Sequence, residues 1–264
     1  MKVAGIDMGG MTTKLVILED SSILYHGITV TADSSEMAAQ RAIERGLHDV
    51  HLKMGELSYI IATGMTRKKV SVANEVKSSI ICLAKGAIWL FPQARTVIDV
   101  GGEETLALNM DKAGRVTLFT SNDKCAAGSG FFLESLAKML EMSTEDMAKE
   151  ALKAEKAVNI SGTCTIFAEQ EILSHTFDVP PVPMPDIIAG LHESLAGRVI
   201  GLVKNLRILP EIVLCGGVAR NPAFVRSLNK RVSTELLVPE DPQIVPALGA
   251  ALLAEERAHE GKGN

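Results

Sequence analysis

The hydrophobic and polar positions divide the first third of the chain into short apolar runs and longer helical patterns. The runs are typical of strands, and a Gly-Gly turn and an Asp-Ser-Ser turn join the first three into a meander. A spacing of three and four residues between apolar positions predicts the helices. The expected strands are residues 3–8, 14–19, 23–30 and 57–62, and the expected helices are residues 34–51 and 72–91.

The same order of elements begins again near residue 96, and a mostly helical half follows it. The expected strands there are residues 96–100, 105–109, 115–120 and 211–215. The expected helices are residues 131–140, 144–154, 165–175, 186–205, 222–230 and 247–258. The segments Ala4-Gly5-Ile6-Asp7-Met8-Gly9-Gly10 and Thr96-Val97-Ile98-Asp99-Val100-Gly101-Gly102 can be superposed. This internal repeat predicts two similar lobes.

Paired glycines follow three of the expected strands, at Gly9-Gly10, Gly101-Gly102 and Gly216-Gly217. Glycine permits a sharp turn and lets backbone N–H groups point at an anion. Asp7 and Asp99 stand just before two of the pairs, and carboxylates beside a polyphosphate suit Mg²⁺. Tight turns of an ordinary α/β protein are the alternative for any one pair. Three pairs, two with an Asp, favour a phosphate site.

Composition narrows the class of protein. The 264 residues are 47% hydrophobic and 22% charged with a net charge of −5, which is typical of a globular chain. The acidic balance argues against binding of nucleic acid. Because no segment approaches 18 uninterrupted apolar residues, we expect no membrane span, and an acid as early as Asp7 argues against a signal peptide. We therefore expect a cytoplasmic protein.

Two of the four cysteines, Cys125 and Cys164, stand at the starts of expected helices. Backbone N–H groups and the helix dipole favour a thiolate there, the form that binds iron. Two cysteines cannot supply the four thiolates of a [4Fe–4S] cluster, but a two-fold dimer can. Their spacing alone does not decide whether Cys125 and Cys164 are metal ligands or structural thiols. We expect Cys82 and Cys215, in an apolar helix and a core strand, to be buried and inert.

The three glycine turns resemble the phosphate 1, phosphate 2 and adenosine motifs of the superfamily of actin, Hsp70 chaperones and sugar kinases. The resemblance implies an α/β fold of two duplicated, ribonuclease H-like lobes with a nucleotide cleft between them. The implied lobes are residues 1–94 and 95–246, and residues 247–264 form a helix that joins them. Implied catalytic residues are Asp7, Asp99, Glu103 and Glu104. Implied nucleotide-binding residues are Gly9, Gly10, Thr12, Thr13, Lys14, Gly101, Gly102, Gly216, Gly217 and Val218.

A closer resemblance lies in the two cysteine segments. The run Asn122-Asp123-Lys124-Cys125-Ala126-Ala127-Gly128-Ser129-Gly130 and the segment 161–169 are similar to the signature of the activators of 2-hydroxyacyl-CoA dehydratases. These activators are related to the ATPase subunits of benzoyl-CoA reductase, the BadF/BadG/BcrA/BcrD type. The resemblance covers essentially the whole chain.

This resemblance implies an ATPase that binds ATP or ADP with Mg²⁺ and shares one [4Fe–4S] cluster, held by Cys125 and Cys164, across a homodimer or a dimer of paralogues. It further implies anaerobic, ATP-coupled transfer of single electrons from a ferredoxin or flavodoxin to a dehydratase or reductase that itself holds an Fe–S cluster.

The chain departs from the activator pattern at two turns. The second phosphate turn of the activators usually contains Gly-Gly-Gln-Asp, where this chain has Gly101-Gly102-Glu103-Glu104. Their Thr-Gly-Tyr-Gly-Arg turn is here Thr63-Gly64-Met65-Thr66-Arg67. The sequence leaves two other hypotheses open. A sugar or N-acetylglucosamine kinase shares the phosphate turns but needs no cluster, and an actin-like or chaperone-like switch only binds nucleotide.

Overall fold

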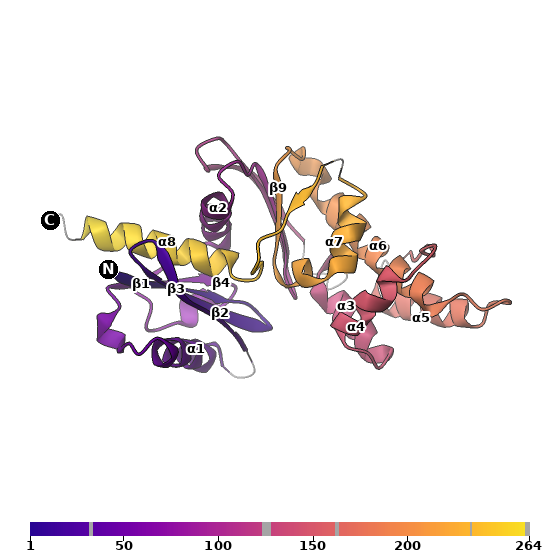
Figure 1. Ribbon diagram of the computed structural model, residues 1–264, viewed down its shortest axis with the longest axis horizontal. Helices are drawn as coiled ribbons and strands as arrows, with labels where there is room; N and C mark the ends of the chain where they lie inside the picture. Colours follow the sequence, from indigo (N-terminus) through magenta and orange to yellow (C-terminus); the bar gives the residue numbers. More distant parts are fainter. Residues whose placement is uncertain (32–33, 123–127, 162–163, 233, 262–264) are drawn as a thin grey trace. The chain divides into compact units, whose positions relative to one another are not determined.

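Two five-stranded sheets of the same strand order form the framework of the protein (Figure 1). The computed structural model describes residues 1–31, 34–122, 128–161, 164–232 and 234–261. The first sheet has the order β3-β2-β1-β4-β5 and the second has the order β10-β9-β6-β7-β8. In both, the first strand of a three-strand meander lies beside the strand that follows a crossover. The two sheets confirm the internal repeat and the α/β class.

The strands of the first sheet are β1 (Lys2–Met8), β2 (Thr12–Glu19), β3 (Ser22–Val30), β4 (Tyr59–Gly64) and β5 (Glu75–Val76). β1 is antiparallel to β2 and parallel to β4. Its register pairs Asp7 with Lys14 on one side and with Thr63 on the other. The carboxyl ends of β1 and β4 therefore meet at the same edge of the sheet.

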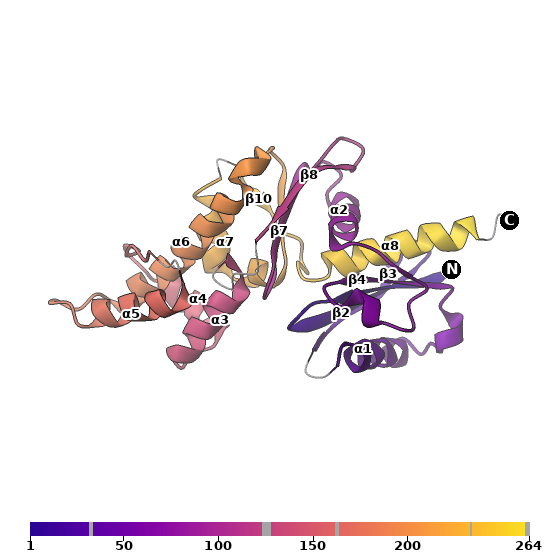
Figure 2. The same cartoon turned by 180° about the vertical axis from the view of Figure 1, so that it is seen from behind.

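Helices cover both faces of this sheet. Figure 1 and its reverse view in Figure 2 show α1 (Ser35–Asp49) on one face and α2 (Ser79–Leu90) with α8 (Val245–Glu260) on the other. Successive residues of β1 serve the two faces, because side chains alternate along a strand. Val3 packs against the α8 side and Ala4 against the α1 side. Both faces of β1 are therefore buried.

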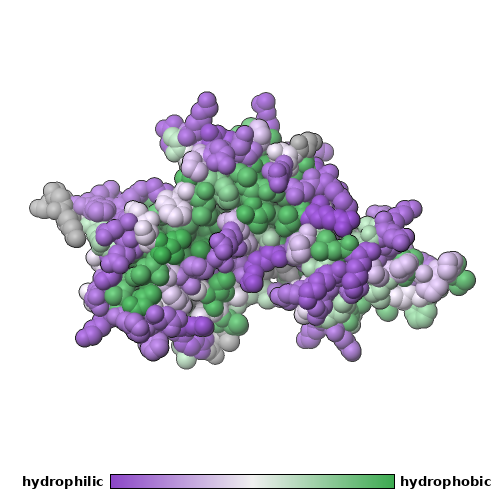
Figure 3. Space-filling model, viewed as in Figure 1, coloured by the Kyte–Doolittle hydropathy of each residue, from purple (hydrophilic) through white to green (hydrophobic). Residues whose placement is uncertain are grey.

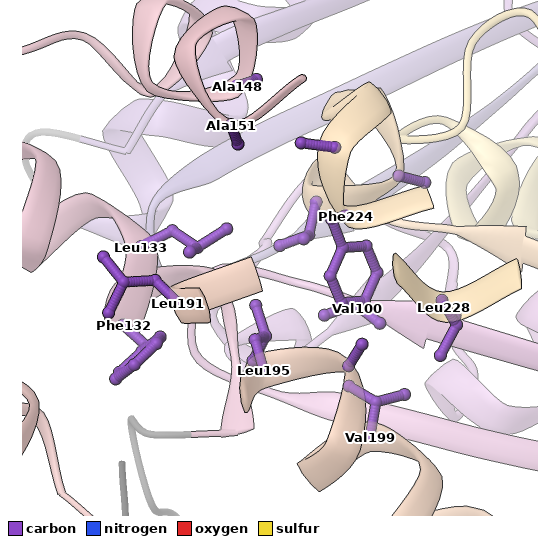
Figure 4. Packing of buried hydrophobic residues seen from close by; sticks show 14 of the residues in the cluster. Val100, Phe132, Leu133, Ala148, Ala151, Leu191, Leu195, Val199, Phe224 and Leu228 are labelled. Carbon is purple, nitrogen blue, oxygen red and sulfur yellow. The ribbon is translucent and has the colours of Figure 1, made fainter. Parts of the chain in front are cut away.

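The strands of the second sheet are β6 (Thr96–Val100), β7 (Thr105–Met110), β8 (Val116–Ser121), β9 (Ile212–Cys215) and β10 (Leu236–Leu237). The helices of this half are α3 (Gly130–Met139), α4 (Thr144–Leu152), α5 (Thr165–Thr176), α6 (Met184–Val203) and α7 (Pro222–Asn229). Figure 4 shows side chains of α3, α4, α6 and α7 converging near Val100, with Phe132 and Phe224 among the largest buried side chains.

Contacts along the chain divide it into two compact units. Unit 1 comprises Met1–Val97, Leu108–Leu118 and Pro239–Asn264, and unit 2 comprises Ile98–Ala107 and Phe119–Val238. α8 belongs to unit 1, where its small residues lie against the sheet; a side chain on Gly5 would come within 2.1 Å of the carbonyl oxygen of Ala247. The predicted lobe boundaries at residues 94 and 246 remain a prediction.

One helix was predicted too long, and two short strands were missed. The helix expected over residues 72–91 begins only at Ser79, where the Ser78 hydroxyl caps it by accepting from the N–H of Ile81 at 3.4 Å. The residues before it contain β5, which pairs in parallel with β4. The two-residue strand β10 was not predicted, because two residues carry no periodicity. Every other expected helix and strand is present, with its ends moved by three residues at most.

Candidate functional site

The first glycine turn links β1 to β2 and lies beside an ion pair between Lys14 and Asp7. The Gly9 N–H donates to the Thr12 carbonyl at 3.1 Å, which closes the turn. Lys14 Nζ lies 3.3 Å from Asp7 Oδ2 and donates to the same Thr12 carbonyl at 3.2 Å. Both charged side chains are only 13% and 10% exposed, respectively. This arrangement presents one ammonium group and turn N–H groups, the chemistry that recognises phosphate.

The second glycine turn links β6 to β7 with the same closure. The Gly101 N–H donates to the Glu104 carbonyl at 2.8 Å. The position that corresponds to Lys14 is here Leu106, which is buried, whereas Glu103 and Glu104 are exposed. The second turn is therefore acidic, and its carboxylates suit a divalent cation or an attacking water.

A glycine at the end of the neighbouring strand lies against each of the two aspartates. Gly64, the last residue of β4, has φ +92°, and a side chain there would come within 2.6 Å of Asp7 Oδ1. Gly216, after β9, has φ +88°, and a side chain there would come within 2.3 Å of Asp99 Oδ1. Because L residues with a side chain rarely adopt this φ, glycine fits both positions. Each aspartate thus lies between its own glycine pair and the glycine of the adjacent strand.

The turn after β4 lies beside the first phosphate turn, and sequence reasoning did not include it in the site. The Met65 N–H donates to the Met8 carbonyl at 2.9 Å, and Arg67 Nη1 donates to the Gly64 carbonyl at 2.8 Å. The Thr66 hydroxyl oxygen is buried and has no hydrogen-bond partner among the described residues. A buried polar group of this kind fits a ligand or water. The available signal was the Gly64 at the end of a strand adjacent to β1.

The described residues at the third turn lie in unit 2 with Asp99. Gly216 follows β9, and Gly217 and Val218 begin the short 3₁₀ helix η5 (Gly217–Arg220). A side chain on Gly130, the first residue of α3, would come within 2.9 Å of Val218 Cγ2. The second and third turns therefore pack together around the start of α3.

The side chains of Thr12 and Thr13, both predicted to bind nucleotide, lie on opposite faces of β2. Thr13 is fully buried, and its hydroxyl lies 3.0 Å from the Thr31 hydroxyl. Thr12, one residue earlier, is half-buried and supplies its carbonyl to Gly9 and Lys14. Alternation along β2 places these two side chains on opposite faces. The nucleotide-binding roles of both residues remain a prediction.

The described cysteines fall into two environments. Cys82 and Cys215 are fully buried, as expected. Burial raises the pKa of the Cys82 thiol to about 12, and burial together with the charge of Asp99 raises the pKa of the Cys215 thiol. Cys164 is half-buried and is the N-cap residue of α5. Its expected partner Cys125 lies outside the described residues.

The described residues also bear on the expected metal centre and on the expected lack of a membrane span. Within the described ranges, no three His, Cys, Asp or Glu side chains gather as ligands of one metal ion. Among the helices that the structure describes, none combines the length and the apolar character that a membrane crossing needs.

The duplicated sheets and glycine turns define a class of nucleotide-binding α/β ATPases, and comparison with known proteins places the chain within it. The chain belongs to the BadF/BadG/BcrA/BcrD ATPase family, whose model matches residues 4–254.

The chain is 39% identical to the activator of lactoyl-CoA dehydratase from Anaerotignum propionicum, over 98% of this chain and 99% of the relative. It is 36% identical to the 2-hydroxyisocaproyl-CoA dehydratase activator of Clostridioides difficile, over 99% of this chain and 98% of the relative. A solved structure of the activator from Clostridium difficile with bound ADPNP matches with a TM-score of 0.93, covering 100% of this chain and 97% of that one.

Proposed function

We propose that the protein is an ATP-hydrolysing activator that transfers single electrons to a partner Fe–S enzyme of the 2-hydroxyacyl-CoA dehydratase or benzoyl-CoA reductase type. Membership of an ATPase family and likeness to dehydratase activators support the class of function. The position of Cys164 carries the electron-transfer part, because among the described cysteines it alone is accessible and begins a helix.

In this proposal, each glycine turn binds a different part of the nucleotide. Lys14 and the turn formed by Gly9 and Gly10 bind the β- and γ-phosphates of ATP, and Thr12 and Thr13 complete that turn. Gly101 and Gly102, with Asp99, Glu103 and Glu104, hold Mg²⁺ and the attacking water. Gly216, Gly217 and Val218 contact the adenosine. The ammonium group of Lys14 above Asp7 and the buried Thr66 hydroxyl support a phosphate ligand at the first turn.

Cys125 and Cys164 from each of two protomers ligate one [4Fe–4S] cluster in this proposal. The cluster supplies a one-electron carrier that four thiolates hold. Cys164 is the N-cap residue of α5, and the positive end of the helix dipole there favours added negative charge on the cluster. A ferredoxin or flavodoxin supplies the electron.

An exposed apolar surface next to Cys164 supports a dimer or a partner contact. Apolar side chains of α5 and the loop after it are each more than half exposed: Ile166, Phe167, Leu173, Phe177 and Val179. Figure 3 shows pale and green atoms over this end of the molecule, at the right of the view. Soluble chains rarely leave such a surface uncovered, so a second copy or the downstream enzyme covers it.

The decisive experiment measures iron. Protein purified without oxygen is expected to contain about four irons per dimer. Cys164→Ser and Cys125→Ser are each expected to lose that iron. Cys82→Ala removes a buried thiol of unit 1 and serves as the matched control that keeps it. A Cys164→Ser protein with the full iron content contradicts the proposal.

The rival functions predict other results. A colourless, iron-free protein that phosphorylates a sugar supports a kinase, and nucleotide turnover that is indifferent to reductant supports a switch. An anaerobic assay that follows both ATP hydrolysis and reduction of an acceptor separates the three functions. We expect the two rates to rise together when a reductant is added.

A further inference from the structure

A buried histidine of α6 contacts the residue that follows the third glycine turn. His192 is fully buried in unit 2. Its Nδ1 lies 2.8 Å from the Ile188 carbonyl oxygen, and its Nε2 lies 3.1 Å from Asn221 Nδ2. Asn221 directly follows η5, the short helix that begins with Gly217 and Val218. The contact therefore connects α6 to the third turn through a side chain that the proposed function does not use.

Three hydrogen bonds hold Asn221 in place. Its backbone N–H donates to the Val218 carbonyl at 3.0 Å, which closes η5. Its Oδ1 accepts from the Phe224 N–H at 3.0 Å and so caps the N-terminus of α7. Its Nδ2 lies against His192. The position of Asn221 therefore fixes where the third turn ends and where α7 begins.

These hydrogen bonds allow one arrangement of protons. A backbone N–H only donates, so the oxygen of the Asn221 amide faces Phe224 and its nitrogen faces the histidine ring. The amide nitrogen is a donor, so Nε2 of His192 presents its lone pair. The ring proton is then on Nδ1, where the Ile188 carbonyl accepts it. Burial lowers the pKa of His192, which keeps the ring in this neutral form.

We infer that His192 is a positioning residue for the adenosine end of the nucleotide and acts through Asn221. The inference rests on the proposed function in so far as Gly216, Gly217 and Val218 contact adenosine. A ring held by the 20-residue helix α6 fixes the Asn221 side chain before nucleotide binds. A turn that is already ordered loses less conformational entropy on binding, so the bond raises the affinity for adenosine. In the proposed function other turns bind the phosphates, whose affinity does not depend on this bond.

Two substitutions remove the contact from its two ends. His192→Leu replaces the ring with an apolar side chain that has no acceptor. Asn221→Ser leaves a side chain too short to reach His192, but its hydroxyl still caps α7, because serine is a preferred N-cap residue. If His192→Leu does not fold, Asn221→Ser still removes the contact.

Two further variants serve as controls. His192→Gln keeps an acceptor near the position of Nε2, so we expect it to preserve binding. His175→Leu is the matched control, because His175 is on α5, next to α6, and its Nδ1 lies 3.0 Å from Asp178 Oδ2. Its partner is not part of the third turn, so we expect wild-type binding.

The test compares two ligands on the full-length protein at neutral pH and fixed Mg²⁺. Calorimetry measures the Kd of ADPNP and of inorganic tripolyphosphate, which has phosphates but no adenosine. In His192→Leu and in Asn221→Ser we expect the ADPNP affinity to fall about tenfold, as for the loss of one buried hydrogen bond, and the tripolyphosphate affinity to change less than about twofold. The double variant is expected to lose no more than either single variant. General damage to the fold lowers both affinities, so their ratio separates it from positioning.

Nitrogen NMR of protein with isotope-labelled histidine tests the contact without nucleotide. We expect Nε2 of His192 to resonate as an unprotonated nitrogen and Nδ1 as a protonated one, and the signals that His192→Leu removes identify the ring. Asn221→Ser is expected to shift the Nε2 signal, because that nitrogen loses its donor.

An unchanged ADPNP affinity in His192→Leu and Asn221→Ser overturns the inference, and so does an equal loss for both ligands or a protonated Nε2. A loss in His192→Gln or His175→Leu as large as in His192→Leu also overturns it. Wild-type protein that binds ADPNP no more tightly than tripolyphosphate refutes the adenosine contact, and the inference with it. Protein that shows the expected affinity ratios but contains no iron when purified without oxygen refutes the electron-transfer function and leaves the role of His192 intact.

Discussion

The glycine turn after β1 and the glycine turn after β6 close through the same backbone bond, at 3.1 Å and 2.8 Å, but carry different charges. The first has Lys14 beside Asp7, and the second has Glu103 and Glu104 after Asp99. Moreover, the second turn accepts the first N–H groups of α3, which follows the Cys125 segment. Under the proposed function, this difference gives the duplicated backbone two tasks: the first turn binds phosphate and the second turn binds the metal ion.

The largest effect is expected from the aspartate of the second turn. Asp99→Asn keeps the shape of the side chain and removes the negative charge that, in the proposed function, holds Mg²⁺ or orients the water. We expect ATP turnover to fall about 10³-fold, the size of a typical acid–base contribution, while ADPNP binding changes less than tenfold. Steady-state phosphate release and calorimetry measure the two quantities.

Asp111→Asn, in the loop between β7 and β8, is the control for that variant, and we expect it to retain turnover. Asp7→Asn sharpens the comparison, because it also releases Lys14 from its ion pair. Equal losses of turnover and of binding in Asp7→Asn and Asp99→Asn argue against a division of tasks between the turns.

A smaller effect is expected from the cation of the first turn. Lys14→Met removes a charge-assisted bond to phosphate worth about 1.5–3 kcal/mol, so ADPNP affinity is expected to fall about 10- to 100-fold. Calorimetry at fixed Mg²⁺ measures it. Lys85→Met removes a half-buried lysine of α2 that pairs with Glu256 and is expected to leave the affinity unchanged. If Lys14→Met leaves the ADPNP affinity unchanged, the phosphates bind elsewhere.

The smallest effect concerns acid stability, which we expect to differ between the units. His192 on α6 is buried, and burial lowers its pKa. Its Nδ1 donates to the Ile188 carbonyl at 2.8 Å, and its Nε2 accepts from Asn221 at 3.1 Å. These bonds hold the neutral ring. Below the ordinary pKa of 6.5 the unfolded chain binds a proton that the native state does not. The free energy of unfolding therefore falls as the pH drops below 6.5, by at most about 1.4 kcal/mol per pH unit.

Hydrogen exchange of α6 measures this loss in unit 2, and fluorescence of Trp89, the one tryptophan in the sequence, follows unit 1. His192→Gln is expected to flatten the dependence in α6. A parallel loss in both units, unchanged in His192→Gln, indicates that other groups cause the acid sensitivity.

Local chemistry made much of the fold predictable. Each glycine pair follows an apolar run and ends it, so the two meanders and their turns were visible in residues 3–30 and 96–120. The helix expected over residues 72–91 was too long because apolar residues continue through Val76, and only pairing with β4 makes Glu75 and Val76 a strand. Pairing of this kind depends on a distant partner and leaves no periodic signal in two residues.

The amino-acid sequence by itself determined the repeated strand-and-turn pattern, and the cation of one turn and the acids of the other. It also separated the cysteines of apolar segments, Cys82 and Cys215, from those at helix starts. Each of these depends on residues adjacent in the chain. Only the tertiary structure decided that Gly64 lies against Asp7 and Gly216 against Asp99, and that His192 contacts Asn221. These contacts form when strands and helices separated by long crossovers pack together, and burial of their apolar faces, not local spacing, chooses the neighbours.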